Sequence, residues 1–372
     1  MPTPVPVRIC ATGLFTPAQS ISNEELVTAY NAWVDLWNGQ NPDRQKEHSS
    51  PEFIEKASGI KSRFVMDKTG PLDINRMRPH LPKRSNDELS ILAEMACVAA
   101  REAMKSADLT GADIDAVICG ASNLQRAYPA IAVEIQDELG IDGFAFDMNV
   151  ACASAAFAIQ NAVGLIATGA RRVLVVNPEM CTAHINFRDR DCHFIFGDVA
   201  TAVIIEKADG ASTGEAWDII DTRLKTKFSN NIRNNFGFMS HTSDELDISD
   251  PETDQLFKQE GRKVFKDVVP MVGEMISTHL ADNDIPVAEI KRLWLHQANL
   301  AMNDFIAKKV LGRPAERIEN PVVLDEYANT SSAGSIIAFH KHRSDLVVGD
   351  IGVISGFGAG YSAGSVIVKK VG

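Results

Sequence analysis

Apolar and polar positions along this chain alternate in blocks that are typical of strands interleaved with helices. Residues 112–123, ADIDAVICGASN, run from a polar helix end through an apolar strand into a small polar loop ending in Asn. Residues 288–299, AEIKRLWLHQAN, repeat that arrangement, and a helical pattern follows each copy. The same order continues in two further pairs of strand patterns, 171–180 with 350–360 and 196–209 with 361–372. Four matches in one order indicate a duplicated unit of strands alternating with helices.

The boundary between the two units is expected at a turn rich in Gly, Ser and Thr, Asp209–Gly214, which follows a strand pattern. The sequence therefore predicts an N-terminal half of residues 1–208 and a C-terminal half of residues 209–372. Three polar stretches exceed what the repeat needs, namely 27–50, 75–87 and 228–256. Within 87–111, small and apolar residues at spacings of three and four predict a helix.

A single cysteine, Cys152, lies at the join between two apolar segments. FAFDMNV, residues 144–150, predicts a buried strand, and residues 153–169 predict a helix that is apolar nearly all round. The free N–H groups and the positive dipole end at a helix N-terminus stabilise a thiolate, so we expect a lowered pKa for this thiol. Most free cysteines are buried structural residues, and from the local pattern both interpretations stay open.

Two polar residues of the second unit are candidate partners for a nucleophilic thiol. His296 lies just past the strand in RLWLHQANLAMN, and Asn329 lies in LDEYANTSSAGS before a helical segment. Taken singly, the histidine is an ordinary loop residue and the asparagine a helix-capping residue. Strand ends of duplicated units converge when the units pack back to back, so we predict that both side chains lie near Cys152.

Composition narrows the class of protein. The chain has 372 residues, 45% of them hydrophobic and 23% charged, which is typical of a globular protein. A net charge of -12 argues against general nucleic-acid binding, and six cysteines without a CxxC pair disfavour a metal site. No apolar run reaches about 18 residues, and the N-terminus lacks the order of a signal peptide. We therefore expect a cytoplasmic protein that does not span a membrane.

The chain resembles the thiolase superfamily, and within it the β-ketoacyl-acyl-carrier-protein synthase III group. The resemblance rests on NVACASAAF around Cys152, HQAN from His296, YANTSSAGS around Asn329, and the segments IFGDVATAVII, GIKSRF and FGAGYSAGS. These motifs span nearly the whole chain in the family's order. The resemblance implies an α/β fold in which duplicated halves stack as a five-layered αβαβα sandwich with mixed sheets, and it makes Cys152 the nucleophile.

The implied activity is that of an acyltransferase of fatty acid biosynthesis, which catalyses a decarboxylative Claisen condensation. Cys152 takes the acyl group of an acyl-CoA, and malonyl-acyl-carrier protein loses carbon dioxide and attacks the acyl-enzyme. By resemblance, His296 and Asn329 hydrogen-bond the thioester oxygen on which charge grows. Backbone N–H groups of Cys152 and Ala359 form a second oxyanion hole, provided that Ala359, which replaces a glycine, needs no positive φ. CoA and carrier-protein thioesters are substrates, and no cofactor or metal is implied.

Further residues receive roles from the resemblance alone. Tyr128, in LQRAYPA, matches an aromatic residue that reaches into the partner's acyl pocket in a homodimer; a surface tyrosine in a proline turn is the alternative. Asn299 matches a residue that contacts the pantetheine arm. Lys308 and Lys309 match basic positions on the helix that docks the carrier protein, with two solvated helix charges as the alternative.

Departures from the family pattern bear on the substrate. Phe53 and Ala57 stand where acetyl-CoA-using members carry a tryptophan and an arginine that grip CoA. With the extra stretches, this pattern looks closer to members that take medium-chain groups such as octanoyl-CoA and make a β-ketodecanoyl product.

Three alternatives remain at this stage. They are a type III polyketide synthase-like enzyme, a non-decarboxylating acyl-CoA condensing enzyme and a catalytically silent binding homologue. Residues 121–133 contain no Asp or Glu to serve as the base that non-decarboxylating relatives need. Because Cys152 and His296 are both present, the silent homologue is disfavoured. The type III polyketide synthase shares the three candidate residues and stays open.

Overall fold

The computed structural model describes residues 5–210, 214–242, 244 and 253–372. In this part of the chain, nine strands form one mixed sheet in the order β11-β12-β13-β8-β1-β7-β6-β4-β5. The strands of the N-terminal half are β1 (Val7–Phe15), β4 (Ala116–Gly120), β5 (Phe144–Met148), β6 (Arg172–Met180) and β7 (Asp198–Lys207). Those of the C-terminal half are β8 (Trp217–Ser229), β11 (Ile290–Leu295), β12 (Ile351–Gly358) and β13 (Gly360–Lys370).

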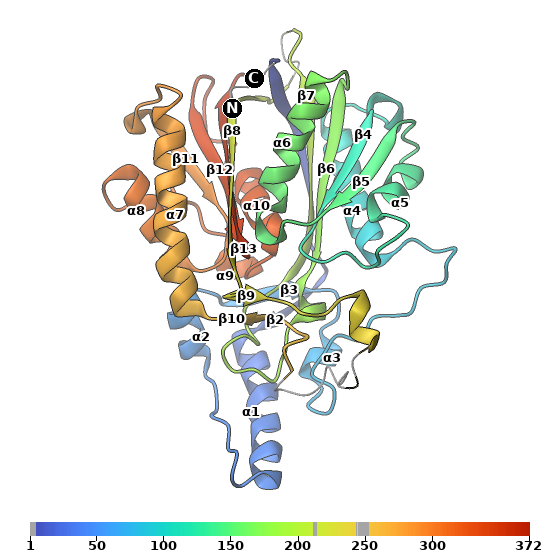
Figure 1. The fold of residues 1–372 in the computed structure, drawn as a ribbon, viewed down its shortest axis with the longest axis vertical. Helices are drawn as coiled ribbons and strands as arrows, with labels where there is room; N and C mark the ends of the chain where they lie inside the picture. Colours follow the sequence, from blue (N-terminus) through green and yellow to red (C-terminus); the bar gives the residue numbers. More distant parts are fainter. Residues whose placement is uncertain (1–4, 211–213, 243, 245–252) are drawn as a thin grey trace.

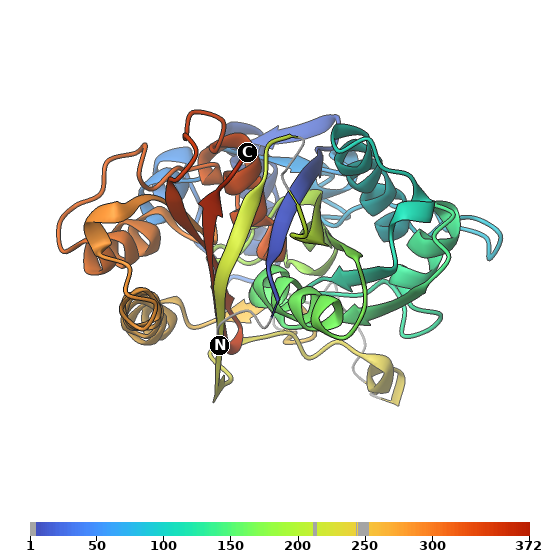
Figure 2. The same ribbon diagram turned by 90° about the horizontal axis from the view of Figure 1, so that it is seen from above.

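The sheet divides into two parts at the junction of β1 and β8. These strands share only two residue pairs, Arg8 with Asp218 and Ile9 with Trp217, whereas β13 and β8 pair along most of their length. Seen from above, the two sets of strands diverge and helices fill the space between them (Figure 2). Strands β4, β5 and β6 are parallel, as are β11 and β12, whereas the others pair antiparallel, so both parts are mixed.

Helices form three of the five layers (Figure 1). The middle layer is α6 (Ser154–Ala167) with α10 (Gly334–Lys341), and one apolar cluster joins both helices to strands of both halves. The outer layers are α4 (Ile91–Ser106) with α5 (Ile131–Glu138), and α7 (Gly261–Ala281) with α8 (Leu300–Leu311). Because the middle helices contact sheet on both sides, they are apolar nearly all round. The predicted αβαβα sandwich is confirmed.

Local signals account for the ends of the predicted helices. The helix expected within 87–111 begins at Ile91, because the Ser90 hydroxyl accepts the N–H of Ala93 as an N-cap. The helix expected within 153–169 is α6, and Gly169, with a φ of 129°, lies just beyond its end.

The prediction of a buried strand at 144–150 is wrong in part. Strand β5 covers Phe144–Met148, and its residues are exposed or half-buried. The reason is its place in the sheet: β5 is an edge strand that pairs with β4 alone among the described strands. Apolar composition does not reveal on how many sides a strand is covered.

The two halves repeat a short turn before their central helix. In the N-terminal half this turn is η2 (Ala151–Ala153), and in the C-terminal half it is η6 (Ser331–Ala333). Each opens with a non-glycine residue in the left-handed region, Ala151 at φ 47° and Ser331 at φ 48°. The repeat therefore extends to backbone conformation, and Ser332 is the counterpart of Cys152. The predicted boundary at residue 208 lies between β7 and β8, in a connection whose residues 211–213 are outside the described residues, and it stays a prediction.

The remaining elements connect the strands and helices of the five layers, and most of them lie at the lower end of the molecule in Figure 1. They are α1 (Asn23–Gln40), α2 (Pro51–Ser58), α3 (Thr69–Leu72), α9 (Leu324–Tyr327), β2 (Gln19–Ser22), β3 (Ser62–Val65), β9 (Ile232–Arg233) and β10 (Lys258–Gln259), with the short turns η1 (Gly111–Asp113), η3 (Cys181–His184), η4 (Phe238–Thr242) and η5 (Val287–Glu289). The extra stretch 27–50 forms most of α1 and the segment that returns along it. Residues 243 and 245–252 of the stretch 228–256 lie outside the described residues.

Candidate active site

Cys152 lies in the turn η2, between β5 and α6, at the join that the sequence indicated. Its sulfur accepts a hydrogen bond from the Ser331 hydroxyl at 3.4 Å, so the turns of the two halves meet at this atom. Gly358, at the end of β12, leaves the room for the sulfur. A Cβ at position 358 would lie 2.8 Å from Cys152 Cβ and 2.9 Å from its Sγ.

The electrostatics of the thiol differ from the expectation. Burial raises the pKa of Cys152 to about 11, and the charge of Glu179 adds to that effect. Hydrogen bonds from the Ser331 hydroxyl and from the backbone N–H groups of Ala359 and Cys152 act in the opposite direction, lowering the pKa. The prediction of a lowered pKa is therefore wrong for the substrate-free site, because desolvation of the thiolate outweighs the donors around it.

Ala359 meets the condition set for an oxyanion-hole donor. The backbone N–H groups of Ala359 and Cys152 both donate to the Cys152 sulfur. Among the described residues with a positive φ, Ala359 does not occur. The replacement of glycine by alanine therefore costs no backbone strain at this position.

His296 follows β11 and is fully buried. Its backbone N–H donates to the Ser355 carbonyl at 2.8 Å, and its ring packs edge-on against Phe357 at 5.3 Å. Burial lowers the pKa of this imidazole to about 3, although a hydrogen bond with the Ser331 backbone opposes the shift. The ring is therefore neutral near pH 7, so it has one N–H to donate and carries no charge to pair with a thiolate.

Asn329 is fixed at both its backbone and its side chain. The Ser331 N–H donates to Asn329 Oδ1 at 2.8 Å, so the amide nitrogen is left to donate elsewhere. The Asn329 N–H donates to the Ile195 carbonyl at 2.9 Å, and its own carbonyl accepts from Gly197. Ser331 thus contacts Cys152, His296 and Asn329, and the structure brings the three predicted residues together around it.

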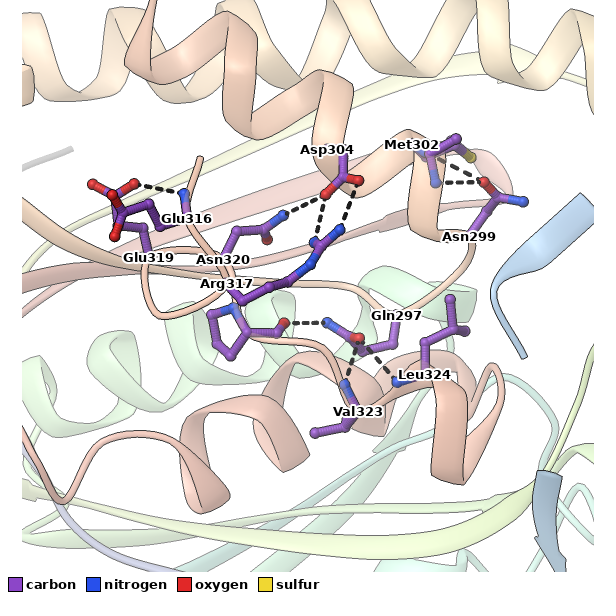
Figure 3. A network of polar contacts seen from close by, with 12 residues as sticks. Gln297, Asn299, Met302, Asp304, Glu316, Arg317, Glu319, Asn320, Val323 and Leu324 are labelled. Carbon is purple, nitrogen blue, oxygen red and sulfur yellow. Dashed lines mark hydrogen bonds and ion pairs between the residues drawn. The ribbon is translucent and has the colours of Figure 1, made fainter. Parts of the chain in front are cut away.

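Gln297 ties the histidine loop to the segment that leads to Asn329, and sequence reasoning missed it. This buried amide donates to the carbonyls of Leu295 and Pro321, and its oxygen accepts from the N–H groups of Val323 and Leu324 (Figure 3). All four contacts are with backbone groups, so a loop after β11 is locked to the chain entering α9. The residue belongs to the HQAN motif, but no local pattern gives its role, because three of its four partners lie 24–27 positions away.

Glu179 is a second residue that the sequence did not indicate. Its carboxylate accepts hydrogen bonds from the N–H and hydroxyl of Ser122 and from the N–H and hydroxyl of Ser332. Burial raises the pKa of Glu179 to about 7, and these four donors limit the rise. Ser332 belongs to the turn that carries Ser331, so this carboxylate fixes that turn against β6.

The other predicted site residues lie outside this cluster. Tyr128 is 86% exposed at a surface loop. Asn299 caps α8, with its Oδ1 accepting from Ala301 and Met302 while its Nδ2 donates to the Ala57 carbonyl at 2.7 Å. Lys308 and Lys309 are exposed on α8, and the stem of Lys309 packs over Gly273 of α7.

A cavity of about 530 Å³ lies between residues 81–92 on one side and residues 234–236 and 255–256 on the other. Much of its lining is apolar and includes Leu92, Leu124, Met180, Phe236 and Leu256. Met180 directly follows Glu179, and Leu124 lies two residues after Ser122, so one wall of the cavity continues from the hydrogen-bond network beside Cys152.

The described residues contain neither a cluster of metal-ligating side chains nor a helix that could span a membrane. No three His, Cys, Asp or Glu side chains among them are grouped to hold a metal ion. None of the helices described here combines the length and apolarity that crossing a membrane requires.

Comparison with known proteins places this geometry in a family. Residues 146–227 match the family 3-oxoacyl-[acyl-carrier-protein] synthase III, and residues 280–370 match its C-terminal family. A beta-ketoacyl-[acyl-carrier-protein] synthase III of Agrobacterium fabrum is 30% identical over 86% of this chain and 91% of its own length. The chain therefore belongs to the 3-oxoacyl-acyl-carrier-protein synthase III family, whose members are acyltransferases.

Within that family, one relative is much more similar. The beta-ketodecanoyl-[acyl-carrier-protein] synthase of Pseudomonas aeruginosa is 62% identical over 92% of this chain and 99% of its own length. Among solved structures, the 3-oxoacyl-[acyl-carrier-protein] synthase III of Aquifex aeolicus superposes with a TM-score of 0.76 at 24% identity, covering 98% of this chain and 99% of that one. The structural match supports the fold.

Proposed function

We propose that this chain condenses a medium-chain acyl-CoA, such as octanoyl-CoA, with malonyl-acyl-carrier protein to give a β-ketoacyl-carrier product. The chain-length assignment is carried by one observation, the 62% identity over nearly full length to a beta-ketodecanoyl-[acyl-carrier-protein] synthase. The apolar cavity beside the site supports it, because the far end of a medium-length chain needs an apolar enclosure of this kind.

In the first half-reaction, the Cys152 thiol loses its proton to solvent and its sulfur attacks the thioester carbon of the acyl-CoA. A carbon–sulfur bond to Cys152 forms, the bond to CoA breaks, and the CoA thiolate leaves and takes up a proton. The N–H groups of Cys152 and Ala359, which hydrogen-bond the Cys152 sulfur, donate in this proposal to the oxyanion of the tetrahedral intermediate. Each such donor is worth about 2.7–4 kcal/mol in the transition state.

In the second half-reaction, malonyl-carrier protein loses carbon dioxide, and the electron pair of the broken bond becomes an enolate. His296 and the Asn329 amide donate to the enolate oxygen, and both are suited to this because one is neutral and the other is oriented by Ser331. The enolate carbon attacks the acyl-Cys152 carbonyl, and the Cys152 thiolate leaves as the β-ketoacyl product forms. No base is consumed, which agrees with the lack of Asp and Glu in residues 121–133.

The assembly and location are further parts of the proposal. We infer a homodimer, in which the exposed Tyr128 and the half-exposed edge strand β5 are available for contact with a second copy. Asn299 is proposed for the pantetheine arm, and Lys308 and Lys309 for the carrier protein. A cytoplasmic location fits substrates of this kind.

The test is intact-protein mass spectrometry after incubation with acyl-CoAs of two to twelve carbons, with Cys152→Ala as the control. The expected result is an acyl adduct on Cys152 that is strongest near eight carbons, and that malonyl-carrier protein discharges to a β-ketoacyl product. Loading by acetyl-CoA alone would refute the medium-chain assignment. Adducts that persist with the malonyl donor would refute condensation, and products extended more than once would favour a polyketide synthase.

A further inference from the structure

The sulfur of the half-buried Cys152 has a side-chain hydrogen-bond donor that the catalytic scheme above does not use. Ser331 Oγ donates to Cys152 Sγ at 3.4 Å, and its side chain is buried. A thiolate is a stronger acceptor than a thiol, because a hydrogen bond to a charged group is roughly twice as strong as one between neutral groups. The contact therefore strengthens when the sulfur ionises.

Other sources of stabilisation for this thiolate are weak. His296, the nearby basic residue, is neutral near pH 7 and supplies no positive charge. Glu179 disfavours ionisation of the sulfur. Apart from the two backbone N–H groups, the donor that the described residues present to the sulfur is the Ser331 hydroxyl.

The backbone around Ser331 holds the hydroxyl in place at a conformational cost. Ser331 has a φ of 48°, in the left-handed region that residues other than Gly, Asn and Asp seldom adopt. Such a conformation persists when its surroundings fix it, and here the Ser331 N–H is bound to Asn329 while Ser332 is bound through two groups to Glu179.

We propose that Ser331 is a fourth catalytic residue, whose hydroxyl donates a hydrogen bond to the Cys152 sulfur and stabilises the thiolate that attacks the acyl thioester. The role rests on the proposed function, since it assigns a task in the first half-reaction. Its backbone N–H has the separate task of orienting Asn329 for the second half-reaction. The two tasks are separable because a substitution of the side chain leaves the N–H in place.

The experiment compares Ser331→Ala with Thr330→Val. Thr330 Oγ1 is buried and has no hydrogen-bond partner, so this neighbouring substitution removes a hydroxyl without removing a contact. The rate of iodoacetamide alkylation at Cys152 is followed from pH 7 to 9 by peptide mass spectrometry. Below its pKa the thiol reacts in proportion to its thiolate fraction, so loss of the donor lowers the rate at every pH.

For Ser331→Ala we expect alkylation and octanoyl loading to fall about 10-fold, from the strength of a hydrogen bond to a charged group. Decarboxylation of malonyl-carrier protein stays within about 2-fold of wild type, because Asn329 keeps its orientation. Thr330→Val alkylates at the wild-type rate. Ser331→Gly, which relieves the left-handed strain, shows the same alkylation loss and guards against a folding defect in the alanine variant.

Wild-type alkylation rates in folded Ser331→Ala and Ser331→Gly would overturn the proposal, as would an equal loss in Thr330→Val. Iodoacetamide needs no acyl donor, so this result is independent of the substrate. If wild-type Cys152 alkylates as described but no acyl-CoA loads, the proposed function fails while the role of Ser331 in thiolate stabilisation stands.

Discussion

The turn that carries Cys152 in the N-terminal half has a counterpart in the C-terminal half, the turn that carries Ser332. Their backbones match, with Ala151 at φ 47° in one and Ser331 at φ 48° in the other. Each turn also packs against the equivalent strand of the opposite half, η2 on β12 and η6 on β6. The two turns therefore have the same backbone conformation and pack against equivalent strands.

The side chains make these environments different. Opposite Cys152 the strand β12 has Gly358, which leaves space for the sulfur. At the matching position of β6 the chain has Glu179, which fills that space and binds Ser332 through its N–H and hydroxyl. One turn is kept open for a reactive group and the other is closed by a carboxylate. The two turns share a backbone geometry, and the residue at one equivalent strand position, Gly358 or Glu179, decides whether there is space beside the turn.

Removal of the thiol is expected to have the largest effect, and transfer of a thiol to the second turn should not reverse it. Cys152→Ala lowers condensation by about 10³-fold or more, because the nucleophile is lost. The double variant Cys152→Ala with Ser332→Cys stays inactive, because Glu179 disfavours a thiolate beside it. Acyl adducts measured by intact mass test both statements, and an adduct at position 332 would mean that the two turns are interchangeable.

Loss of the enolate donors is the next effect in size. Asn329→Ala and His296→Ala are each expected to lower malonyl-carrier decarboxylation about 10²–10³-fold, the range for one oxyanion donor. Loading of Cys152 by acyl-CoA should change little, since it uses the backbone donors. Single-turnover measurements of the two half-reactions separate these outcomes. Equal losses in both half-reactions would assign the two residues to the thiol instead.

Filling the space beside Cys152 should make the turn η2 resemble the filled turn η6. Gly358→Ala places a methyl group within 2.9 Å of the sulfur, so the turn must move. We expect a loss of about 1–3 kcal/mol in unfolding free energy and slower acyl loading. The control is Gly164→Ala in α6, where a Cβ meets no atom within 4 Å and helix propensity improves. Chemical denaturation and loading rates report both effects, and full activity of Gly358→Ala would contradict the packing argument.

Glu179, the β6 carboxylate that binds the second turn, should make the stability of the protein depend on pH. The folded pKa of Glu179, about 7, is above its ordinary value of 4.5, so the fold favours the protonated form. Its contribution to stability is thus complete below about pH 4.5 and is lost as the pH rises through 7, on the order of 3 kcal/mol. Glu179→Gln should remove this dependence and speed alkylation of Cys152, because the charge that raises the thiol pKa is absent. The unfolding free energies of wild type and Glu179→Gln are measured at pH 5 and pH 8. An equal change with pH in the two proteins would refute this role of Glu179.

The smallest expected effect concerns the start of two equivalent helices, α5 after β4 and α8 after β11. Helix α5 begins after Ala130, and its first N–H groups are bound by the carboxylate of the distant Asp147. Helix α8 begins after Asn299, whose own Oδ1 accepts two N–H groups. Asn299→Ala removes the acceptor at the start of α8 and should cost about 1 kcal/mol in unfolding free energy. Asn299→Asp keeps the cap and loses the donor to Ala57. If Asn299→Asp is as stable as wild type but has a raised KM for acyl-CoA, the proposed pantetheine contact is supported.

Much of the fold could be predicted from the sequence, because the residue patterns that indicate helices, strands and turns are local. The helix at Ile91–Ser106, the repeat of strand and loop, and the position of Cys152 between strand and helix all follow from spacing and composition within a dozen residues. The approach of His296 and Asn329 to the thiol followed from the duplication, since equivalent strand ends meet when the halves pack together.

Other features depended on contacts between distant segments. The exposure of β5 follows from its place at the sheet edge, and Ser331, Gln297 and Glu179 take their roles from partners far along the chain. The cavity is lined by five separate segments of the chain, within 81–92, 123–126, 180–184, 234–236 and 255–256.

The sequence by itself determined the strand and helix order, the duplication and the candidate residues, because periodicity and turn chemistry act between near neighbours. Tertiary structure decided the ionisation of Cys152 and His296, because desolvation depends on every segment that excludes water from the site. It also decided which of two equivalent turns stays open, since that rests on a glycine and a glutamate brought in from the opposite half.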